Sequence, residues 1–358
     1  MIPISVCIIG KNEEQHLENC LVPLKAYPFE IVYVDTGSAD GSKEIAAKYA
    51  DKVFDFTWCN DFSAARNFAV SKASHNTILS LDCDEYLTQL NEDALYEAVN
   101  AHEQGVGRIL LNNYYVANDT PTNYPERVDR LFSRKHFHFA GSIHEQLVFL
   151  KDDSHLYESY DLPLVADHAG YSDPETMKKK AERNNELLFA ELKKRPEDPY
   201  LYFQIGQSYN SIRDYENAYM NYKQSFALHL NPYEPWVQIM ATAYINAMNH
   251  TGRSREAVRF FEPIYAHFAN DANFYCSMGN AYLNLHPPKP LNAMAEYIKA
   301  LQCPTAREEG ANTFIPYYNI GLVNEMMGNP EAALTFYERA AGLGFMPAIE
   351  KLKEMEPT

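Results

Sequence analysis

Two carboxylates one residue apart give the sequence its clearest chemical signal. Asp82 and Asp84 lie in the run Ile78-Leu79-Ser80-Leu81-Asp82-Cys83-Asp84-Glu85, which is typical of a buried strand that ends in a loop. Side chains two residues apart in extended backbone point to the same side. Like charges this close repel unless something positive lies between them, and a divalent cation with oxygen ligands meets that need. The pair is therefore either a metal site or a solvated acidic turn.

Apolar runs along the N-terminal half predict the elements that would position this pair. Strands are expected at residues 4–9, 30–35, 52–56 and 77–81, and helices at about 15–25, 42–49 and 63–74. The apolar, β-branched strands indicate burial on both faces, and their alternation with helices is the signature of a doubly wound, mostly parallel sheet. We therefore predict an α/β domain here.

Polar residues collect where these predicted strands end. Asn12 and Glu14 follow the first strand, Asp35 ends the second, and Asp82 and Asp84 end the fourth. Because ligands of open α/β sheets bind outside the carboxyl ends of the strands, this arrangement predicts a nucleotide site. The sequence has neither the glycine-rich dinucleotide fingerprint nor a P-loop, so neither of those classes is indicated.

Three ordered motifs resemble the family-2 glycosyltransferases, which are inverting enzymes of the A-type fold that use nucleotide-diphosphate sugars. The motifs are Val6-Cys7-Ile8-Ile9-Gly10-Lys11-Asn12-Glu13-Glu14, Val34-Asp35-Thr36-Gly37-Ser38-Ala39-Asp40-Gly41-Ser42 and Leu81-Asp82-Cys83-Asp84-Glu85. The resemblance implies that Asp35 contacts the base or ribose and that Asp82 contacts the sugar or ribose. It also implies that Asp84 holds Mg²⁺ or Mn²⁺ on the diphosphate of a UDP-sugar, where the metal stabilises the leaving group as a Lewis acid. Asn12 and Glu14 complete the predicted donor site.

A further segment resembles part of the same family. Residues 58–67 are similar to the stretch that precedes the acidic pair, which makes Arg66 a candidate for the diphosphate because a guanidinium matches phosphate geometry. The alternative is an arginine on a helix surface. Asn67 and Asp61 are weaker candidates for binding the hydroxyls of the donor sugar.

An inverting enzyme also needs a base that removes the proton of the acceptor. The run Phe139-Ala140-Gly141-Ser142-Ile143-His144-Glu145 resembles an F-x-G-x-(I/V)-H-E segment of a bacterial branch of the family that includes lipopolysaccharide-core glucosyltransferases. Glu145 is the predicted base, with His144 to orient it or to serve instead, and Asp129 is the reserve candidate. The alternative is that the His-Glu pair is only a salt-bridged loop.

A histidine near the end of this half is the last candidate. Residues 164–171 resemble an H-x-G-Y element of the same branch, in which His168 follows the final predicted strand. A histidine at this place is a common metal ligand in A-type enzymes, so we predict that His168 joins Asp84 on the metal. The alternative is a purely structural histidine.

The C-terminal half repeats itself from Asp198 onward. Residues 202–222 and 317–340 match the tetratricopeptide pattern of about 34 residues, and residues 275–297 and 236–261 are looser copies. The pattern predicts antiparallel helix pairs that stack on their neighbours to bury their apolar faces. The predicted organisation is a nucleotide-sugar-binding domain at residues 1–172, a helical connector at 173–197 and a repeat domain at 198–358.

Charge and cysteine content limit the partners and the compartment. A formal charge of −17 argues against non-specific binding to nucleic acid or anionic membranes. The six cysteines are scattered without zinc-ligand spacing, and the chain enters its first strand without room for a signal segment. No apolar run approaches the roughly 20 residues of a membrane span. We expect a cytoplasmic protein without an integral membrane segment.

The leading hypothesis is a metal-dependent, inverting transfer of a hexose from a UDP-sugar to an acceptor. A catalytic domain followed by these repeats resembles the bacteriocin S-glycosyltransferases, which implies a peptide or protein acceptor and a homodimer formed through the repeats. Similar layouts in enzymes of surface polysaccharides leave a glycan acceptor open. The alternative is a catalytically inactive repeat scaffold that binds protein partners.

Overall fold

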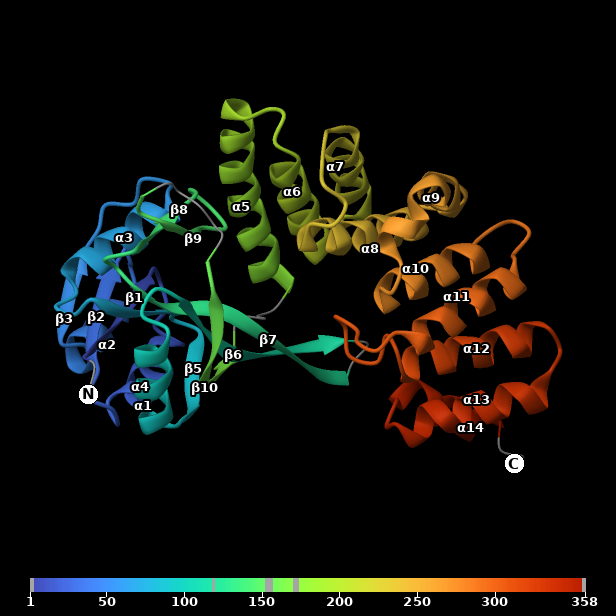
Figure 1. Ribbon diagram of the computed structural model, residues 1–358, viewed down its shortest axis with the longest axis horizontal. Helices are drawn as coiled ribbons and strands as arrows, with labels where there is room; N and C mark the ends of the chain where they lie inside the picture. The colour runs from blue at the N-terminus through green and yellow to red at the C-terminus, as the bar shows by residue number, and fades with distance from the viewer. Residues whose placement is uncertain (1–2, 118–119, 152–156, 170–173, 356–358) are drawn as a thin grey trace. The chain divides into compact units, whose positions relative to one another are not determined.

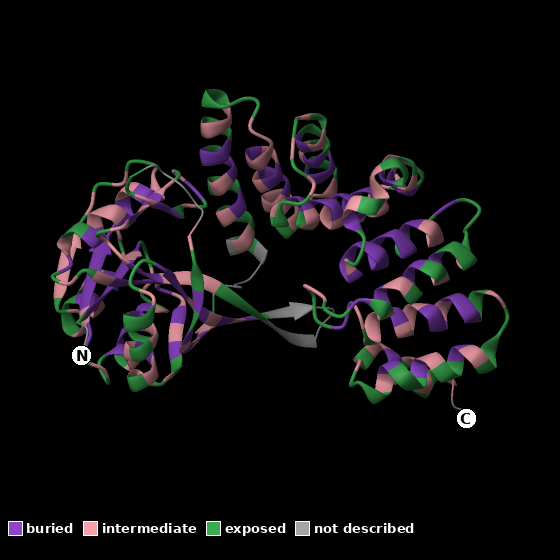
Figure 2. Ribbon diagram, in the orientation of Figure 1, coloured by how far each residue is buried: buried purple, intermediate pink, exposed green. Residues whose placement is uncertain are grey.

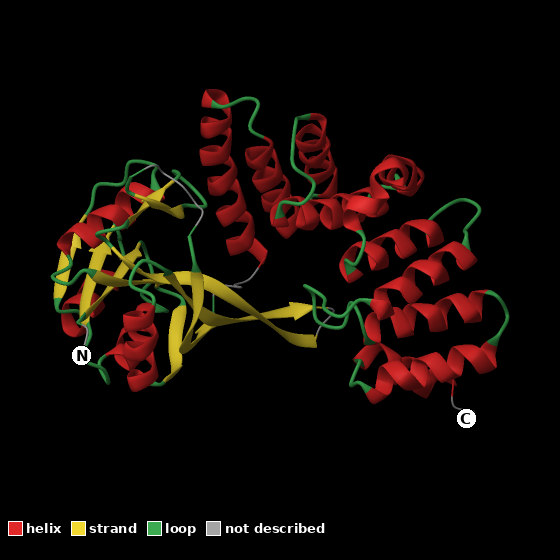
Figure 3. Cartoon of the chain, in the orientation of Figure 1, coloured by secondary structure: helices red, strands yellow, loops and turns green. Residues whose placement is uncertain are grey.

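The computed structural model describes residues 3–117, 120–151, 157–169 and 174–355 (Figure 1). The chain forms two compact units, Met1–Met177 and Lys178–Thr358, and each unit has its own core. All strands of the described residues belong to the first unit, whereas the second is built from helices (Figure 3). The domain boundary predicted at residue 172 lies outside the described residues.

Eight strands of the described residues form one sheet in the first unit, in the order β3-β2-β1-β4-β7-β6-β10-β5. The first four strands of that order run parallel to one another, and β10 is parallel to β6. β7 is antiparallel to β4 and β6, and β5 is antiparallel to β10. The strands are β1 (Ile4–Gly10), β2 (Glu30–Asp35), β3 (Lys52–Asp55), β4 (Thr77–Asp82), β5 (Glu85–Leu90), β6 (Val106–Ala117), β7 (Thr120–Ser133) and β10 (Ser159–His168).

Helices and a small hairpin bury the two faces of this sheet. α1 (Leu17–Leu24), α2 (Ser42–Tyr49) and α4 (Glu92–Ala101) contribute apolar side chains to the core on one face. α3 (Phe62–Lys72) packs on the other face together with the hairpin of β8 (Phe137–Ala140) and β9 (Gln146–Phe149). The predicted α/β fold with a mostly parallel, doubly wound sheet is confirmed.

The strands β6 and β7 are longer than the sequence predicts. From the sequence alone, the apolar run at residues 108–111 predicts a short strand, and residues 127–137 predict two short strands. Instead, β6 and β7 pair from Gly107 opposite Leu131 to Ala117 opposite Thr120. The added residues are mostly polar, so no apolar alternation marks them, and their backbone groups are satisfied by the partner strand. β7 then ends at Ser133, before β8 begins.

The second unit consists of helix pairs, as the repeats predict. Figure 2 shows that buried residues follow one side of most of these helices, and the predicted connector contains the helix α5. None of the described helices is long and apolar enough to span a bilayer. The helices are α5 (Pro174–Lys194), α6 (Pro199–Ser211), α7 (Tyr215–Ala227), α8 (Pro235–His250), α9 (Ser254–Phe261), the 3-10 helix η1 (Glu262–Phe268), α10 (Ala272–Leu283), α11 (Pro290–Gln302), α12 (Phe314–Met326), α13 (Pro330–Gly342) and α14 (Met346–Met355).

Close contact between a glycine and a tyrosine ring explains why the repeated motif contains both residues. In three pairs the first helix carries a glycine where the tyrosine ring of the second helix leaves no room for a side chain. A Cβ atom on this glycine would lie 2.4 or 2.5 Å from a ring carbon, closer than any real contact. The degenerate pair α8–α9 instead packs Trp236 against the aromatic rings of α6. The three glycine–tyrosine pairs are Gly206–Tyr222, Gly279–Tyr297 and Gly321–Tyr337.

Candidate active site

The parallel strands bring the predicted donor residues to one edge of the sheet. Gly10 at the end of β1 lies opposite Asp35 of β2 on one side, and Ile9 lies opposite Asp82 of β4 on the other. The two aspartates therefore flank the end of the central strand. This is the carboxyl edge of the sheet, where open α/β folds bind their ligands.

Asp35 is buried with one carboxylate oxygen engaged and the other unsatisfied. Its Oδ1 accepts hydrogen bonds from the backbone amides of Gly37 and Ser38, each at 2.9 Å. Its Oδ2 is buried and accepts no hydrogen bond within the described residues, although Asp35 is only 2% exposed. An unsatisfied buried acceptor is unfavourable, so Oδ2 is suited to accept a hydrogen bond from a ligand.

Asn12 and Glu14 hold the loop that follows Asp35. The Oδ1 of Asn12 accepts from the amide of Ala39 at 2.8 Å, and the Oε2 of Glu14 accepts from the amide of Gly41 at 3.1 Å. Asn12 adopts a positive φ of 59°, which turns the chain after β1 toward this loop. Both predicted donor-binding side chains therefore stabilise the loop through its backbone.

Asp82 lies between two guanidinium groups. Its Oδ1 is 2.6 Å from Nη2 of Arg66, and its Oδ2 is 3.0 Å from Nη2 of Arg130. Burial alone would raise the pKa of Asp82, but the two arginines hold that pKa well below its ordinary value. Arg66 and Arg130 therefore relieve the repulsion that the sequence predicts for Asp82.

Arg66 connects Asp82 to the predicted base. Its Nε donates to the carboxylate of Glu145, and its Nη1 lies 3.2 Å from the hydroxyl of Ser80. The side chain is 8% exposed, so the alternative of a surface arginine is wrong. Burial opposes its charge, but Asp82 and Glu145 raise its pKa. The predicted contact with a diphosphate stays a prediction.

Helix α3 clamps the loop that carries Glu145. The side-chain amide of Asn67 bonds both the carbonyl and the amide of Phe139, at 2.8 and 2.9 Å. The amide of Phe62 donates to the carbonyl of Ser142 at 2.8 Å. Asn67 thus positions the loop through its two hydrogen bonds to β8. This contact differs from the predicted contact with a hydroxyl of the donor sugar.

Two other sequence candidates have local roles. Asp61 caps α3, because its side chain accepts from the amide of Ala64 at 2.9 Å. Asp129, the reserve base, accepts hydrogen bonds from the hydroxyl of Tyr157 at 3.0 Å and from the hydroxyl of Ser159 at 3.5 Å. His144 has a positive φ of 49° and an exposed side chain.

Asp84 and His168 meet at the ends of neighbouring strands. The antiparallel pairing of β10 with β5 places His168 opposite Glu85, next to Asp84. Nε2 of His168 is 3.4 Å from Oδ2 of Asp84, and Nδ1 is 2.8 Å from Oδ1 of Asn113. Burial would lower the pKa of His168, but the neighbouring carboxylates raise it above its ordinary value.

The Asp84–His168 pair fits a metal ion that is shared with a substrate. A carboxylate oxygen and an imidazole nitrogen suit Mn²⁺, and Mg²⁺ is commonly held by one or two carboxylates plus substrate phosphates. The described residues hold no group of three or more metal-ligating His, Cys, Asp or Glu side chains. The remaining ligands would therefore have to come from a diphosphate and from water.

Arg130 and Glu85 were not predicted as site residues. Glu85 is 1% exposed, its carboxylate pairs with Arg130, and it accepts from the amide of Asp82 at 3.1 Å. Burial raises the pKa of Glu85 despite the arginine. The alternation of residues 130–134 predicts that Arg130 and Phe132 point to the same side of a strand. Arg130 could be assigned to the site only if the pairing of β7 with β4 were also known.

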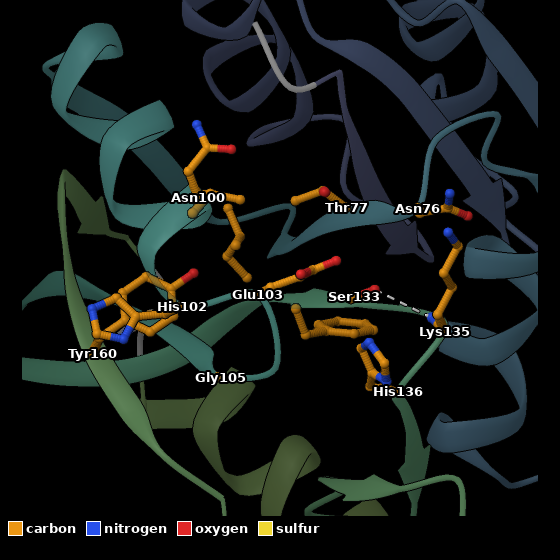
Figure 4. A pocket seen from close by; sticks show the side chains of 13 residues that line it. Asn76, Thr77, Asn100, His102, Glu103, Gly105, Ser133, Lys135, His136 and Tyr160 are labelled. Atoms are coloured by element: carbon orange, nitrogen blue, oxygen red, sulfur yellow. Dashed lines mark hydrogen bonds between the residues drawn. The ribbon is translucent and has the colours of Figure 1, made fainter.

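A separate cavity of about 310 Å³ lies away from this edge (Figure 4). Thr77 begins β4 and Ser133 ends β7, and both line the cavity together with His102, His136 and Tyr160. The cavity is therefore at the start of β4, whereas Asp82 is at its end. None of the predicted site residues lines it.

Comparisons with known proteins agree with this division of the chain. Residues 5–157 match the family "Glycosyl transferase family 2", and residues 199–228 and 316–343 match "Tetratricopeptide repeat". A TPR repeat-containing protein of Synechococcus elongatus is 32% identical over 58% of this chain and 52% of its own length.

Two further relatives have glycosyltransferase names. The lipopolysaccharide core biosynthesis glycosyltransferase LpsC of Rhizobium meliloti is 28% identical over 41% of this chain and 57% of its own length. The prophage-derived glycosyltransferase SunS of Bacillus subtilis is 27% identical over 62% of this chain and 53% of its own length. The chain thus spans little more than half the length of these relatives. Residues 5–157 therefore match a glycosyltransferase domain of family 2, and segments that match tetratricopeptide repeats follow in the same chain.

Proposed function

We propose that this protein is a metal-dependent, inverting glycosyltransferase that moves a hexose from a UDP-sugar to a peptide, protein or glycan acceptor. The main support is the set of acidic groups at one sheet edge. Asp35 offers an unsatisfied buried oxygen, Asp82 is ionised between two arginines, and Asp84 lies beside His168. Together these groups offer acceptors for the N–H and hydroxyl groups of a nucleotide sugar and a ligand pair for a cation on its diphosphate.

The nucleoside is assigned to Asp35 and its loop. A uracil ring carries one N–H donor between two carbonyls, and a ribose carries hydroxyl donors. Either would give the Oδ2 of Asp35 the hydrogen bond that the described residues do not supply. The loop is already fixed by Asn12 and Glu14, so little ordering free energy is lost when a ligand binds.

The diphosphate is assigned to the Asp84–His168 pair. These two side chains would hold Mn²⁺ or Mg²⁺, and the bound cation would stabilise the negative charge that develops on the departing nucleoside diphosphate. Asp82 cannot turn freely toward a metal, because both of its oxygens are paired with arginines. We assign to Asp82 the hydroxyls of the sugar or ribose, for which a fixed and ionised acceptor is suited.

Glu145 is assigned the role of general base. Inversion requires a carboxylate on the acceptor side of the sugar, positioned to take the acceptor proton as the new bond forms. Arg66 holds Glu145 and Asp82 through one guanidinium, so the base and the sugar-binding carboxylate keep a fixed separation. Arg66 is therefore proposed as a positioning residue for the base.

The acceptor is assigned from the repeats. Stacks of helix pairs form extended surfaces that bind peptide segments, which favours a peptide or protein acceptor. A glycan acceptor is supported by the similarity to a lipopolysaccharide core biosynthesis enzyme. We propose the peptide or protein acceptor first, and a homodimer through the repeats as a further element of this proposal.

A thermal-shift screen of nucleotide sugars with and without Mn²⁺ tests the donor site, because a ligand that binds the folded state raises the melting temperature. We expect a metal-dependent shift with UDP-hexoses, and slow hydrolysis of the same donor. Asp35→Asn should lose most of the shift, since the amide places a donor where Oδ2 accepts. The control is Asp55→Asn, at the exposed end of β3. No shift and no hydrolysis with any UDP-sugar would overturn the proposal and favour the inactive scaffold.

A further inference from the structure

The cavity at the start of β4 has the size of a small-molecule site. Its volume of about 310 Å³ is at the small end of the roughly 300–1,000 Å³ that such sites enclose. Figure 4 shows His102 and Tyr160 together at one side of the view, and Asn76 and Lys135 at the other. The cavity is at the opposite end of β4 from Asp82, so the proposed transfer reaction does not use it.

The turn after α4 forms one wall of the cavity and is fixed against β10. The amide of Gly105 donates to the carbonyl of His102 at 3.0 Å, and the amide of Val106 donates to that of Glu158 at 2.9 Å. The ring of His102 stacks on Tyr160 with centroids 4.4 Å apart, and its Nδ1 lies 3.1 Å from the carboxylate of Glu158. Because an ionised carboxylate only accepts, Nδ1 carries the proton, and Nε2 of the neutral ring is an acceptor.

The turn between β7 and β8 forms another wall and is also fixed by the backbone. The amide of Arg134 donates to the carbonyl of Asn76 at 2.9 Å, and the amide of His136 donates to that of Ser133 at 2.9 Å. The hydroxyl of Ser133 accepts from the amide of Lys135 at 3.4 Å, which leaves the hydroxyl proton to be donated. Both walls therefore hold their polar groups in place before any ligand binds, which lowers the ordering cost of binding.

The groups on these walls suit a neutral ligand with several hydroxyls. Amides, hydroxyls and imidazoles offer donors and acceptors side by side, and a sugar hydroxyl uses both. The lining has one carboxylate, Glu103, and one amine, Lys135, so its formal charge with neutral histidines is zero. A strong anion such as phosphate would meet the carboxylate, whereas a sugar requires no net charge. Leu131 and Phe132 supply a buried apolar base for the C–H groups of a sugar ring.

We propose that this cavity binds a neutral mono- or disaccharide unit, separately from the donor site. The unit is either a free sugar or a segment of a glycan acceptor, because both present the same hydroxyls. β4 has six residues, so its two ends lie roughly 17 Å apart, a distance that an acceptor of several sugar rings can span. The site goes beyond the proposed transfer reaction, and only the acceptor source rests on that reaction.

The test is saturation-transfer difference NMR on the full chain, which detects weak binding of small sugars. The probes are glucose, galactose, N-acetylglucosamine, cellobiose and lactose, with saturating UDP and Mn²⁺ present to fill the donor site. We expect at least one of them to bind. Asp84→Asn, which is expected to lose turnover, should keep this binding. Failure of sugar binding therefore leaves the proposed transfer reaction untouched, because donor binding is measured separately.

The variant combines His102→Phe, which keeps a ring against Tyr160, with Ser133→Ala. It removes two hydrogen-bonding groups from the walls, so the affinity for the sugar should fall at least about tenfold. The control is His75→Phe, because the half-buried His75 adjoins Asn76 but does not line the cavity. Equal sugar affinity in the wild type and the folded double variant would overturn the proposal, and so would no binding by any probe.

A second measurement keeps the test valid if the double variant destabilises the domain. Amide hydrogen exchange of the wild-type chain is followed by mass spectrometry with and without the sugar that binds. We expect slower exchange at residues 99–105 and 131–136, and a bound sugar that protects neither segment would contradict the site.

The length of the saccharide separates the two sources. A free sugar predicts equal affinity for the sugar that binds and for the tetrasaccharide built from it. An acceptor segment predicts affinity that grows with length, and a double variant with a raised KM for the glycan acceptor and an unchanged kcat.

Discussion

Three carboxylates share two guanidinium groups at the carboxyl edge of the sheet. Asp82 contacts both Arg66 and Arg130, whereas Glu85 and Glu145 each contact one of them. A buried ion that loses its partner destabilises a fold strongly, typically by about 3–5 kcal/mol. Removing either arginine therefore tests folding and catalysis together, and substitutions that keep the hydrogen bonds are more informative.

Glu145→Gln makes such a test of the base. The amide oxygen can still accept from Nε of Arg66, but glutamine cannot take a proton at neutral pH. We expect transfer to fall by about 10²–10⁴-fold while UDP affinity changes less than about twofold. Product formation and calorimetric titration of UDP measure the two effects. Asp129→Asn is the matched control and should keep both. Loss of UDP binding in Glu145→Gln would show that Glu145 is structural.

Asp84→Asn tests the metal assignment. The substitution keeps the size of the side chain but removes the charge that a divalent cation requires, and it leaves Asp82 between its arginines. We expect metal-dependent turnover of a UDP-sugar to fall by at least about 100-fold. Turnover is measured against Mn²⁺ concentration, with Asp55→Asn as the control. A wild-type rate at ordinary Mn²⁺ concentrations would rule out Asp84 as a ligand.

Glu30 makes the stability of the fold depend on pH. It begins β2, at the opposite end of the strand from Asp35. Burial alone would raise its pKa, but Lys52, Ser5 and the amide of Ser74 lower the pKa to about 2. Lys52 Nζ is 2.8 Å from one oxygen, and the amide of Ser74 is 2.7 Å from the other. The folded state thus favours the ionised form. The stabilisation is complete above the ordinary pKa of a glutamate and is lost as the pH falls toward 2.

Glu30→Gln should therefore destabilise the first unit by about 1–3 kcal/mol at pH 7, because charge-assisted hydrogen bonds are lost. The difference from the wild type should shrink as the pH falls from about 4.5 toward 2. Urea unfolding of both proteins at several pH values measures this difference in the free energy of unfolding. A difference that stays constant between pH 7 and pH 3 would mean that the ionised state of Glu30 adds nothing.

At the scale of elements, the repeats rest on close contact between two helices. The hydroxyl of each tyrosine is held by a side chain of the facing helix, such as Asn280 for Tyr297 at 2.7 Å and Glu325 for Tyr337 at 2.7 Å. The ring fills the space over the glycine, and the hydroxyl keeps a polar partner. The helix spacing is therefore fixed by a size limit and a hydrogen bond together.

Gly321→Ala should break this contact. The added methyl group would lie 2.5 Å from the ring of Tyr337, so the helices must separate, at a cost of about 1–3 kcal/mol. Gly342→Ala is the matched control, because a Cβ there meets nothing within 4 Å and alanine is the better helix former. Thermal unfolding followed by circular dichroism compares the two. Similar melting temperatures for both variants would contradict the packing argument.

Elements whose signal lies in their own residues could be predicted from the sequence. The apolar strands β1, β2 and β4, the acidic pair and the helix pairs belong to this class. The polar extension of β6 and β7 could not be predicted, because only the partner strand stabilises it. The contact between Arg66 and Glu145 joins positions 79 residues apart and depends on how α3 holds the hairpin, which no local pattern encodes.

At the scale of the whole molecule, each of the two compact units has buried core clusters of its own among the described residues. Units with separate cores unfold as separate cooperative transitions. We expect calorimetry of the full chain to show two transitions, and a UDP-sugar with Mn²⁺ to raise only one of them. A single transition that moves as a whole would show that the units unfold together.

The placement of the tryptophans has a practical consequence. The sequence contains two tryptophans, one in each unit. The ring centroids of Trp58 and Phe62 are 4.8 Å apart at the start of α3, and Trp236 of α8 packs against the aromatic rings of α6. Trp58→Phe and Trp236→Phe would each leave a single tryptophan, which can be excited selectively over the 26 tyrosines of the chain. The emission of Trp58 would then report on the clamp around the Glu145 loop, and that of Trp236 on the repeats, without any attached dye.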